Sequence, residues 1–194
     1  MCRKRFFGTR STHHGMKMLN TPNTKLEILP VADAALLLKY YTDNQAHLAP
    51  WEPVRDENYL TLSNWQLMLE NAQTAFEQGS EYRFVALNQD RTEVMGVCNF
   101  TGVARGAFQA CYLGYSISEK YQGQGLMQEV LTAAIDYMFQ TVGLNRIIAN
   151  YMPANERSAG VLKKLGFEQE GYARRYLKIA GQWEDHVLTA KINE

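Results

Sequence analysis

The sequence lacks a net charge, a long apolar run and a cysteine framework. Its 20 basic and 20 acidic residues cancel, so we expect no general attraction to nucleic acid and no direct nucleic-acid binding. No apolar run approaches the roughly 20 residues that span a bilayer, so we expect no membrane contact. The three cysteines, Cys2, Cys98 and Cys111, have neither zinc-ligand spacing nor an even count for disulfides. We therefore expect no metal, buried thiols at Cys98 and Cys111, and a cytoplasmic location.

Residues 1–23 differ in composition from the rest of the chain. They include Arg3, Lys4, Arg5 and Arg10 but no acid, and no apolar stretch of the kind found in a secretory signal. We interpret this segment as a flexible basic arm or as the product of an upstream start codon, with an RNA-touching arm as the alternative. Residues 24–194 are long enough and, at 46% hydrophobic residues over the whole chain, apolar enough for one domain with one core.

Apolar periodicity predicts the order β-α-α-β-β-β-α-β-α-β-β. That order is typical of an α/β domain with a mixed, mostly antiparallel sheet flanked by helices. Pro50 and Pro53 predict a loop over residues 47–59, because each proline lacks an N–H and restricts the residue before it. We expect Trp51, between these prolines, to be a packing anchor, with a ligand contact as the alternative. The closing strands are expected over residues 167–173, 175–179 and 183–190, around the turn at Ala180-Gly181.

The stretch from Ala110 to Gln140 contains a strand, a loop with two glycines and a helix. The strand is expected around Tyr115, and the helix follows from apolar residues three or four apart after Leu126. Between them lies Gln122-Gly123-Gln124-Gly125, where no bulky side chain covers the backbone. The start of a helix carries unpaired N–H groups and a partial positive charge, so this loop is a candidate phosphate site.

The loop does not match two common phosphate-binding motifs. A dinucleotide fingerprint would need a third glycine where Gln128 stands, and no Gly-Lys-Ser/Thr follows for a nucleotide hydrolase. The loop instead resembles the acetyl-CoA loop of the GNAT acetyltransferases, Gln/Arg-x-x-Gly-x-Gly/Ala, with Met127 in place of the usual small last residue. The element order resembles the GNAT fold over residues 24–191, which implies a single GNAT-type domain with splayed central strands.

Further motifs are similar to those of the RimJ/RimL group of this family. They are Trp51-Glu52-Pro53, Gly114-Tyr115-Ser116, Asn155 with Ser158, Lys163–Phe167, Glu170-Gly171 and Trp183–His186. The resemblance implies that the chain transfers an acetyl group from acetyl-CoA to the N-terminal α-amine of an alanine in a small-subunit ribosomal protein. It also implies that the partner is that ribosomal protein terminus, with the pre-ribosomal particle as a further partner.

The resemblance also implies roles for individual residues. Ser158 is the candidate general acid at the leaving sulfur, although it also fits a structural role in the first turn of its helix. Asn155 is a good helix N-cap by type and, by resemblance, a hydrogen-bond partner of the pantetheine arm. The backbone groups of Ser116, Ile117 and Ser118 are expected to pair with pantetheine amides. The pyrophosphate is expected at Gln122, Gly123, Gln124, Gly125, Leu126 and Met127.

The chemistry of the acceptor favours an α-amine. With a pKa near 8, about a tenth of an α-amine is neutral at pH 7, against less than about a thousandth of a lysine side chain. An α-amine therefore demands less of a general base, and the sequence leaves that base open among Glu170, Asp185, Tyr112 and Glu52. Two other functions stay open: a GNAT enzyme for a small amine, such as a polyamine or an aminoglycoside, and a CoA-binding docking factor in ribosome assembly. The sequence leaves the oligomeric state undetermined.

Overall fold

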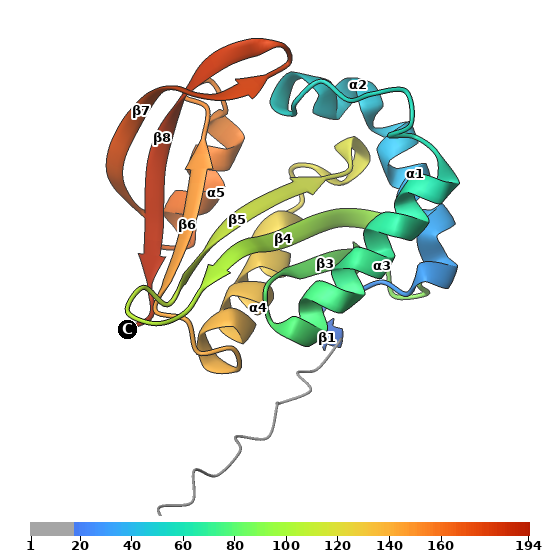
Figure 1. Cartoon of the computed structure of the whole chain (residues 1–194), viewed down its shortest axis with the longest axis horizontal. Coiled ribbons are helices and arrows are strands. Elements are labelled where there is room, and N and C mark those ends of the chain that lie inside the picture. Colours follow the sequence, from blue (N-terminus) through green and yellow to red (C-terminus); the bar gives the residue numbers. More distant parts are fainter. Residues whose placement is uncertain (1–17) are drawn as a thin grey trace, which may run out of the picture.

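The computed structural model describes residues 18–194, which form one eight-stranded sheet in the order β1-β2-β3-β4-β5-β6-β8-β7 (Figure 1). All neighbouring strands are antiparallel except β5 and β6. The strands are β1 Met18–Asn20, β2 Lys25–Glu27, β3 Tyr82–Leu87, β4 Val94–Ala104, β5 Ala110–Ile117, β6 Arg146–Tyr151, β7 Glu168–Ile179 and β8 Gln182–Ile192. The prediction of a mixed, mostly antiparallel sheet is confirmed.

The two central strands separate from each other along their length. β5 pairs with β6 only where residues 110–112 lie beside residues 146–148. Beyond this point β5 runs on to Ile117 and β6 to Tyr151, and their ends diverge (Figure 1). We call the wedge between these diverging ends the splay. The expected splayed central strands are therefore present, and the backbone of β5 is left without a strand partner on this side.

Helices cover both faces of the sheet (Figure 1). α1 Ala34–Asp43 and α3 Leu62–Gln78 pack on one face in a core that contains Leu37 and Trp65. α4 Leu126–Gln140 and α5 Glu156–Lys164 pack on the other face, where Leu131 and Leu162 lie in a second core. Both layers follow from the apolar spacing of the helices, which places their large side chains on one stripe.

The two described cysteines lie in the second core. Cys98 and Cys111 are buried free thiols on β4 and β5, as expected. Burial raises the pKa of Cys111 to about 12 and that of Cys98 further still. Both thiols therefore stay protonated near neutral pH, which makes them unsuitable as nucleophiles.

Three details differ from the sequence prediction. The 47–59 loop is entered through α2 Gln45–Leu48 and the short helical turn η2 Ala49–Trp51. Trp51 is 40% exposed, so it is not the packing anchor that we expected. The predicted strands over 167–173 and 175–179 are one strand, β7, with an irregularity in which Arg175 adopts a φ of 48°.

The start of the folded domain also differs from the prediction. Residues 18–20 were assigned to the basic arm, but they form β1 and pair with β2. The folded domain therefore includes residues before the expected boundary at residue 24. The rest of the predicted arm, residues 1–17, lies outside the described residues. Within residues 18–194, no helix is long and apolar enough to cross a membrane, and no three potential metal ligands are grouped.

Candidate active site

The two-glycine loop leaves the start of α4 open. Gly123 and Gly125 have φ values of 73° and 75°, a left-handed conformation that costs other residues energy. A Cβ atom built at either position would meet no atom within 4 Å outside the glycine and its two chain neighbours. Gly125 is the N-cap residue, and its helix has no side-chain cap. The first-turn N–H groups therefore lie under an uncovered surface, the geometry that binds a phosphate.

Met127 does not narrow this surface. Its side chain is only 9% exposed and belongs to the core between α4 and the sheet. The departure from the small last residue of the GNAT loop pattern is thus accommodated inside the protein, while the backbone of residue 127 remains in the first turn.

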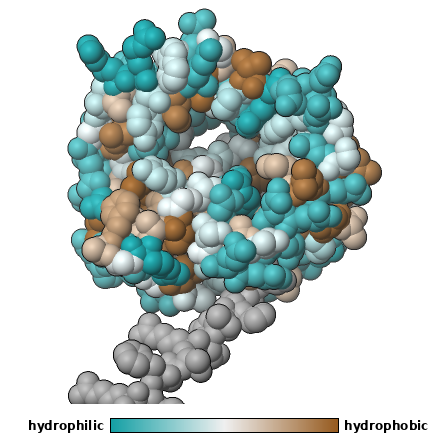
Figure 2. Space-filling view, viewed as in Figure 1, coloured by the Kyte–Doolittle hydropathy of each residue, from teal (hydrophilic) through white to brown (hydrophobic). Residues whose placement is uncertain are grey.

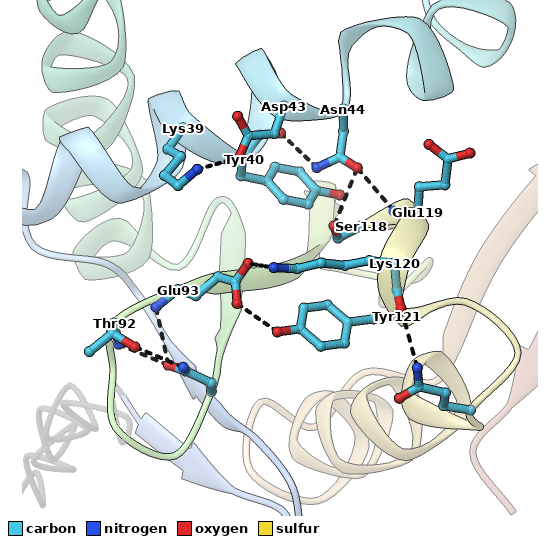
Figure 3. A network of polar contacts seen from close by, with 12 residues as sticks. Lys39, Tyr40, Asp43, Asn44, Thr92, Glu93, Ser118, Glu119, Lys120 and Tyr121 are labelled. Atoms are coloured by element: carbon cyan, nitrogen blue, oxygen red, sulfur yellow. Dashed lines mark hydrogen bonds and ion pairs between the residues drawn. The ribbon is translucent and has the colours of Figure 1, made fainter.

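A polar network holds the segment that leads into the loop (Figure 3). Asn44, at the end of α1, accepts hydrogen bonds from the Ser118 hydroxyl (3.3 Å) and the Glu119 N–H (2.9 Å). On the other side, Glu93 forms an ion pair with Lys120 and accepts a hydrogen bond from the Tyr121 hydroxyl. These contacts tie the turn η3 Glu119–Tyr121 to the end of α1 and to the residue before β4, beside a cavity of about 410 Å³. The loop that follows η3 therefore starts from a fixed position.

Gln122 connects the loop to two helices. Its amide nitrogen lies 3.0 Å from the His47 Nε2, and its amide oxygen accepts a hydrogen bond from Arg157. The same His47 nitrogen lies 3.2 Å from the Ile117 carbonyl oxygen at the end of β5. Residues from α2, the loop and α5 thus meet at the mouth of the splay.

The backbone of β5 alternates between its two sides. The Ser118 N–H donates to the Met95 carbonyl of β4 (2.8 Å). Alternate residues of an antiparallel pair turn their backbone groups to the same neighbour, so Ser116 and Ser118 face β4, while Tyr115 and Ile117 face the splay. Of the three residues predicted to pair with pantetheine, Ser116, Ile117 and Ser118, only Ile117 has backbone groups directed into the splay. Tyr115, which was not among the three, also has its backbone groups directed there.

Ser158 lies across the splay from β5. It stands in the first turn of α5, and its N–H donates to the side chain of the N-cap residue Asn155 (3.1 Å). Its hydroxyl lies 2.5 Å from the hydroxyl of Tyr115 on β5. The N-cap prediction for Asn155 is confirmed. Sequence reasoning missed Tyr115 and considered Tyr112, as a general base, instead. Strand alternation indicates which face of the sheet a tyrosine occupies, but it does not indicate which residue the hydroxyl contacts.

Tyr40 and Glu52 lie on the side of β5 that faces α1. The Tyr40 hydroxyl lies 2.7 Å from the hydroxyl of Ser116. Burial is the main cause that raises the pKa of the Glu52 carboxyl, and the nearby Arg55 partly offsets it. The negative charge of Glu52 also contributes to the raised pKa of Tyr40, although less than burial does. A partly buried carboxyl therefore lies near the tyrosine that supports β5.

The tip of the β7–β8 hairpin closes over this region. The Ala180 N–H donates to the Glu52 carbonyl (2.9 Å), which joins the hairpin tip to the 47–59 loop. Figure 2 shows a hollow near the centre of the same face, where Figure 1 separates the end of β5 from α5. The splay is therefore enclosed on the side of the β7–β8 hairpin tip, and it is open on the face seen in Figures 1 and 2.

The other three candidate bases are tied elsewhere or exposed. Glu170 forms an ion pair with Arg146, and Asp185 accepts hydrogen bonds from the Tyr172 hydroxyl and a backbone N–H. Tyr112 lies in the part of β5 that pairs with β6 and is 44% exposed. Of the four candidates left open by the sequence, Glu52 is the one with a partly buried carboxyl and a raised pKa.

Comparisons with known proteins agree with this geometry. The model of the acetyltransferase (GNAT) domain matches residues 25–168. The ribosomal protein uS5-alanine N-acetyltransferase of Escherichia coli K12 is 50% identical over 184 residues, which cover 95% of this chain and 94% of that protein.

Solved structures give the same result. The ribosomal-protein-S5-alanine acetyltransferase of Vibrio fischeri has a TM-score of 0.88 and 36% identity, covering 91% of this chain and 97% of its own. Mycobacterium smegmatis RimJ, solved in complex with CoA-disulfide, has a TM-score of 0.84 and 28% identity, covering 90% of this chain and 86% of its own.

Proposed function

The chain belongs to the GNAT acetyltransferase family, and we propose that it transfers the acetyl group of acetyl-CoA to the N-terminal alanine of ribosomal protein uS5. This is the activity that the sequence resemblance to RimJ implies. The observation that carries the proposal is the 50% identity to the Escherichia coli uS5-alanine enzyme over nearly the whole length of both chains. The loop, the splay and the hydroxyl at residue 158 supply a site that suits this reaction.

We place acetyl-CoA along the β5 side of the splay. Its pyrophosphate would accept hydrogen bonds from the first-turn N–H groups of α4, which the glycines at 123 and 125 leave uncovered. Its pantetheine arm would pair with the backbone of Tyr115 and Ile117, with Asn155 at the start of α5. His47 would then have to release the Ile117 carbonyl, because that oxygen already has His47 within hydrogen-bonding distance.

The acceptor amine would approach from the side of α1 and η2. Glu52 lies there with a raised pKa, which brings the carboxyl nearer to the working range of a base that removes a proton from an α-ammonium. The amine nitrogen would attack the thioester carbonyl, and Ser158 would supply the proton to the leaving sulfur. Because an α-amine is partly neutral at pH 7, a weak carboxylate base suffices.

The acidic 47–59 loop would attract a basic ribosomal-protein terminus. Between residues 52 and 57, the three acids Glu52, Asp56 and Glu57 outnumber the single base Arg55. Glu52 lies on the acceptor side of the splay, and steering by opposite charge raises the rate of encounter. If Glu52→Gln and Asp56→Asn leave the KM for the peptide unchanged, this part of the proposal is wrong.

The first experiment measures thiol release from acetyl-CoA with a panel of acceptors. The panel holds peptides that begin with free Ala, Ser or Met, the Ala peptide with a blocked α-amine, spermidine and an aminoglycoside. Mass spectrometry locates the added acetyl group. Acetylation of the free Ala terminus but not of the blocked peptide is expected. Turnover only on small amines would indicate a small-molecule acetyltransferase, and CoA binding without turnover would indicate a docking role.

A ribosomal-protein acceptor also places the reaction where ribosomal proteins are made, and we propose the cytoplasm for it. Free uS5 and a pre-ribosomal particle are both candidate forms of the substrate. Comparing turnover on the purified ribosomal protein with turnover on small-subunit precursor particles distinguishes the two.

A further inference from the structure

Tyr115 and Ser158 form a hydroxyl pair that bridges the splay. Tyr115 comes from the diverging end of β5 and Ser158 from the first turn of α5, and their oxygens are 2.5 Å apart. Tyr115 belongs to β5, and Ser158 belongs to the helix that follows β6. At this depth β5 and β6 do not pair, because they are in contact only over their first residues. The hydrogen bond therefore joins the two walls of the site at the point where the thioester would lie.

We propose that Tyr115 is a positioning residue for acetyl transfer: it donates its hydroxyl proton to the Ser158 Oγ, so that the Ser158 O–H points at the leaving sulfur. This inference rests on the proposed function, since it assigns a role within that reaction. It gives a role to Tyr115, which the sequence showed only as the middle residue of the Gly114-Tyr115-Ser116 motif.

The direction of the hydrogen bond follows from the chemistry of the two groups. A phenol is far more acidic than an aliphatic hydroxyl and is the stronger donor, while the serine oxygen offers two lone pairs as acceptor. Asn155 takes the backbone N–H of Ser158, which leaves the Ser158 hydroxyl proton free for another acceptor. With Tyr115 as donor, the remaining direction for that proton is into the splay.

Tyr115 itself is unsuited to be the proton source. Burial is the largest cause that raises its pKa to about 12, against a smaller opposing effect of the hydrogen bond to Ser158. The phenol therefore stays neutral throughout the pH range in which an α-amine acetyltransferase works. A group that keeps its proton can hold an orientation without taking part in the transfer.

The step balances with Tyr115 as a spectator. The neutral amine nitrogen forms a bond to the thioester carbonyl carbon, and the carbon–sulfur bond breaks with its electron pair on sulfur. The Ser158 O–H passes its proton to that sulfur and gives the free thiol of CoA. The nitrogen loses one proton, which reaches the Ser158 oxygen through solvent in the same step, so that no serine alkoxide forms beside the Tyr115 phenol. The products are the acetylated amine and CoA, and Tyr115 keeps its O–H.

The test is a double-mutant cycle with Tyr115→Phe and Ser158→Ala, measured on the free-Ala peptide. General acid catalysis contributes about 100-fold or more, so Ser158→Ala should lower kcat by about that factor. Tyr115→Phe keeps the ring and should lower kcat by about 10-fold, with the KM for acetyl-CoA unchanged. In the Ser158→Ala background, Tyr115→Phe should cause no further loss, because its effect acts through the serine hydroxyl.

The matched control is Tyr137→Phe, a buried tyrosine of α4 in the same core, which should keep full kcat. Thermal unfolding of each variant shows that it is folded. Full kcat in Tyr115→Phe, or losses that multiply in the double variant, would overturn the inference while the proposed function stands. Absence of wild-type turnover on the Ala peptide would overturn the proposed function and this inference together.

Discussion

Replacing Met127 with alanine tests whether the acetyl-CoA loop binds through its backbone. The loop pattern usually ends in a small residue, so the long side chain at this position invites the idea that it obstructs the pyrophosphate. In the structure, the side chain is 9% exposed and packs in the core under α4. We therefore expect Met127→Ala to reduce stability and to leave CoA affinity unchanged.

The magnitude follows from the burial. Met→Ala in a core costs about 2–5 kcal/mol, and a position at the edge of the core belongs in the lower half of that range. A loss of about 2–3 kcal/mol lowers the melting temperature of a domain of this size by roughly 5–10 °C. In the proposed site the main-chain N–H groups contact the phosphates, so the Kd for CoA should stay within about twofold.

The assay combines urea unfolding with calorimetric titration of CoA at a temperature where the variant is folded. The matched control is Leu131→Ala, a fully buried residue further along α4, which should lose at least as much stability with the same unchanged Kd. The reasoning would be refuted by a Kd about tenfold weaker in Met127→Ala, equal to 1.4 kcal/mol, together with a stability loss below about 1 kcal/mol.

Three further predictions concern the loop, its support and the buried carboxyl. Gly125→Ala should destabilise the protein by about 1–2 kcal/mol, because φ is 75°, and should weaken CoA binding at least tenfold in a titration, because its methyl group would cover the phosphate surface. Asn44→Ala should cost about 1–3 kcal/mol in urea unfolding, because it leaves the Ser118 hydroxyl and the Glu119 N–H without their acceptor; a loss below 0.5 kcal/mol would contradict this. For Glu52, the pKa of the folded state lies above the unfolded value of 4.5, so ionising the carboxyl costs stability in the folded protein. This cost is absent below pH 4.5 and grows as the pH rises through the folded-state pKa. Glu52→Gln should therefore raise the melting temperature at pH 7 but not at pH 4, and an equal gain at both would count against a raised pKa.

The positions of the helices and of the phosphate loop followed from local patterns. Apolar residues three or four apart after Leu126 predicted α4, which the structure has over Leu126–Gln140. The glycines at 123 and 125 predicted an uncovered helix start, and both adopt left-handed φ values there. The buried thiols at Cys98 and Cys111 also followed from the strand pattern around them. Each of these properties depends on neighbours within a few positions along the chain.

Properties that depend on distant neighbours were not available from the sequence. Residues 18–20 alternate too briefly to mark a strand, and they become β1 only because β2 offers a partner. Trp51 looked like a core residue by type but is exposed, because the short turn η2 directs it outward. The sequence did not rank the four candidate bases. Glu52 and Glu170 are each paired with an arginine, and the deeper burial of the Glu52 side chain, 23% exposed against 49%, distinguishes the two.

Periodicity along the sequence predicted the single α/β domain, and the resemblance of its motifs indicated the family and the loop that suits acetyl-CoA, because both depend on neighbouring residues. The tertiary structure decided which side chains meet in the splay. Tyr115 and Ser158 are separated by 43 positions and by all of α4 and β6, yet their hydroxyls are in contact. That contact exists because β5 and β6 pair only at their first residues and then diverge, which lets α5 bring its first turn against β5.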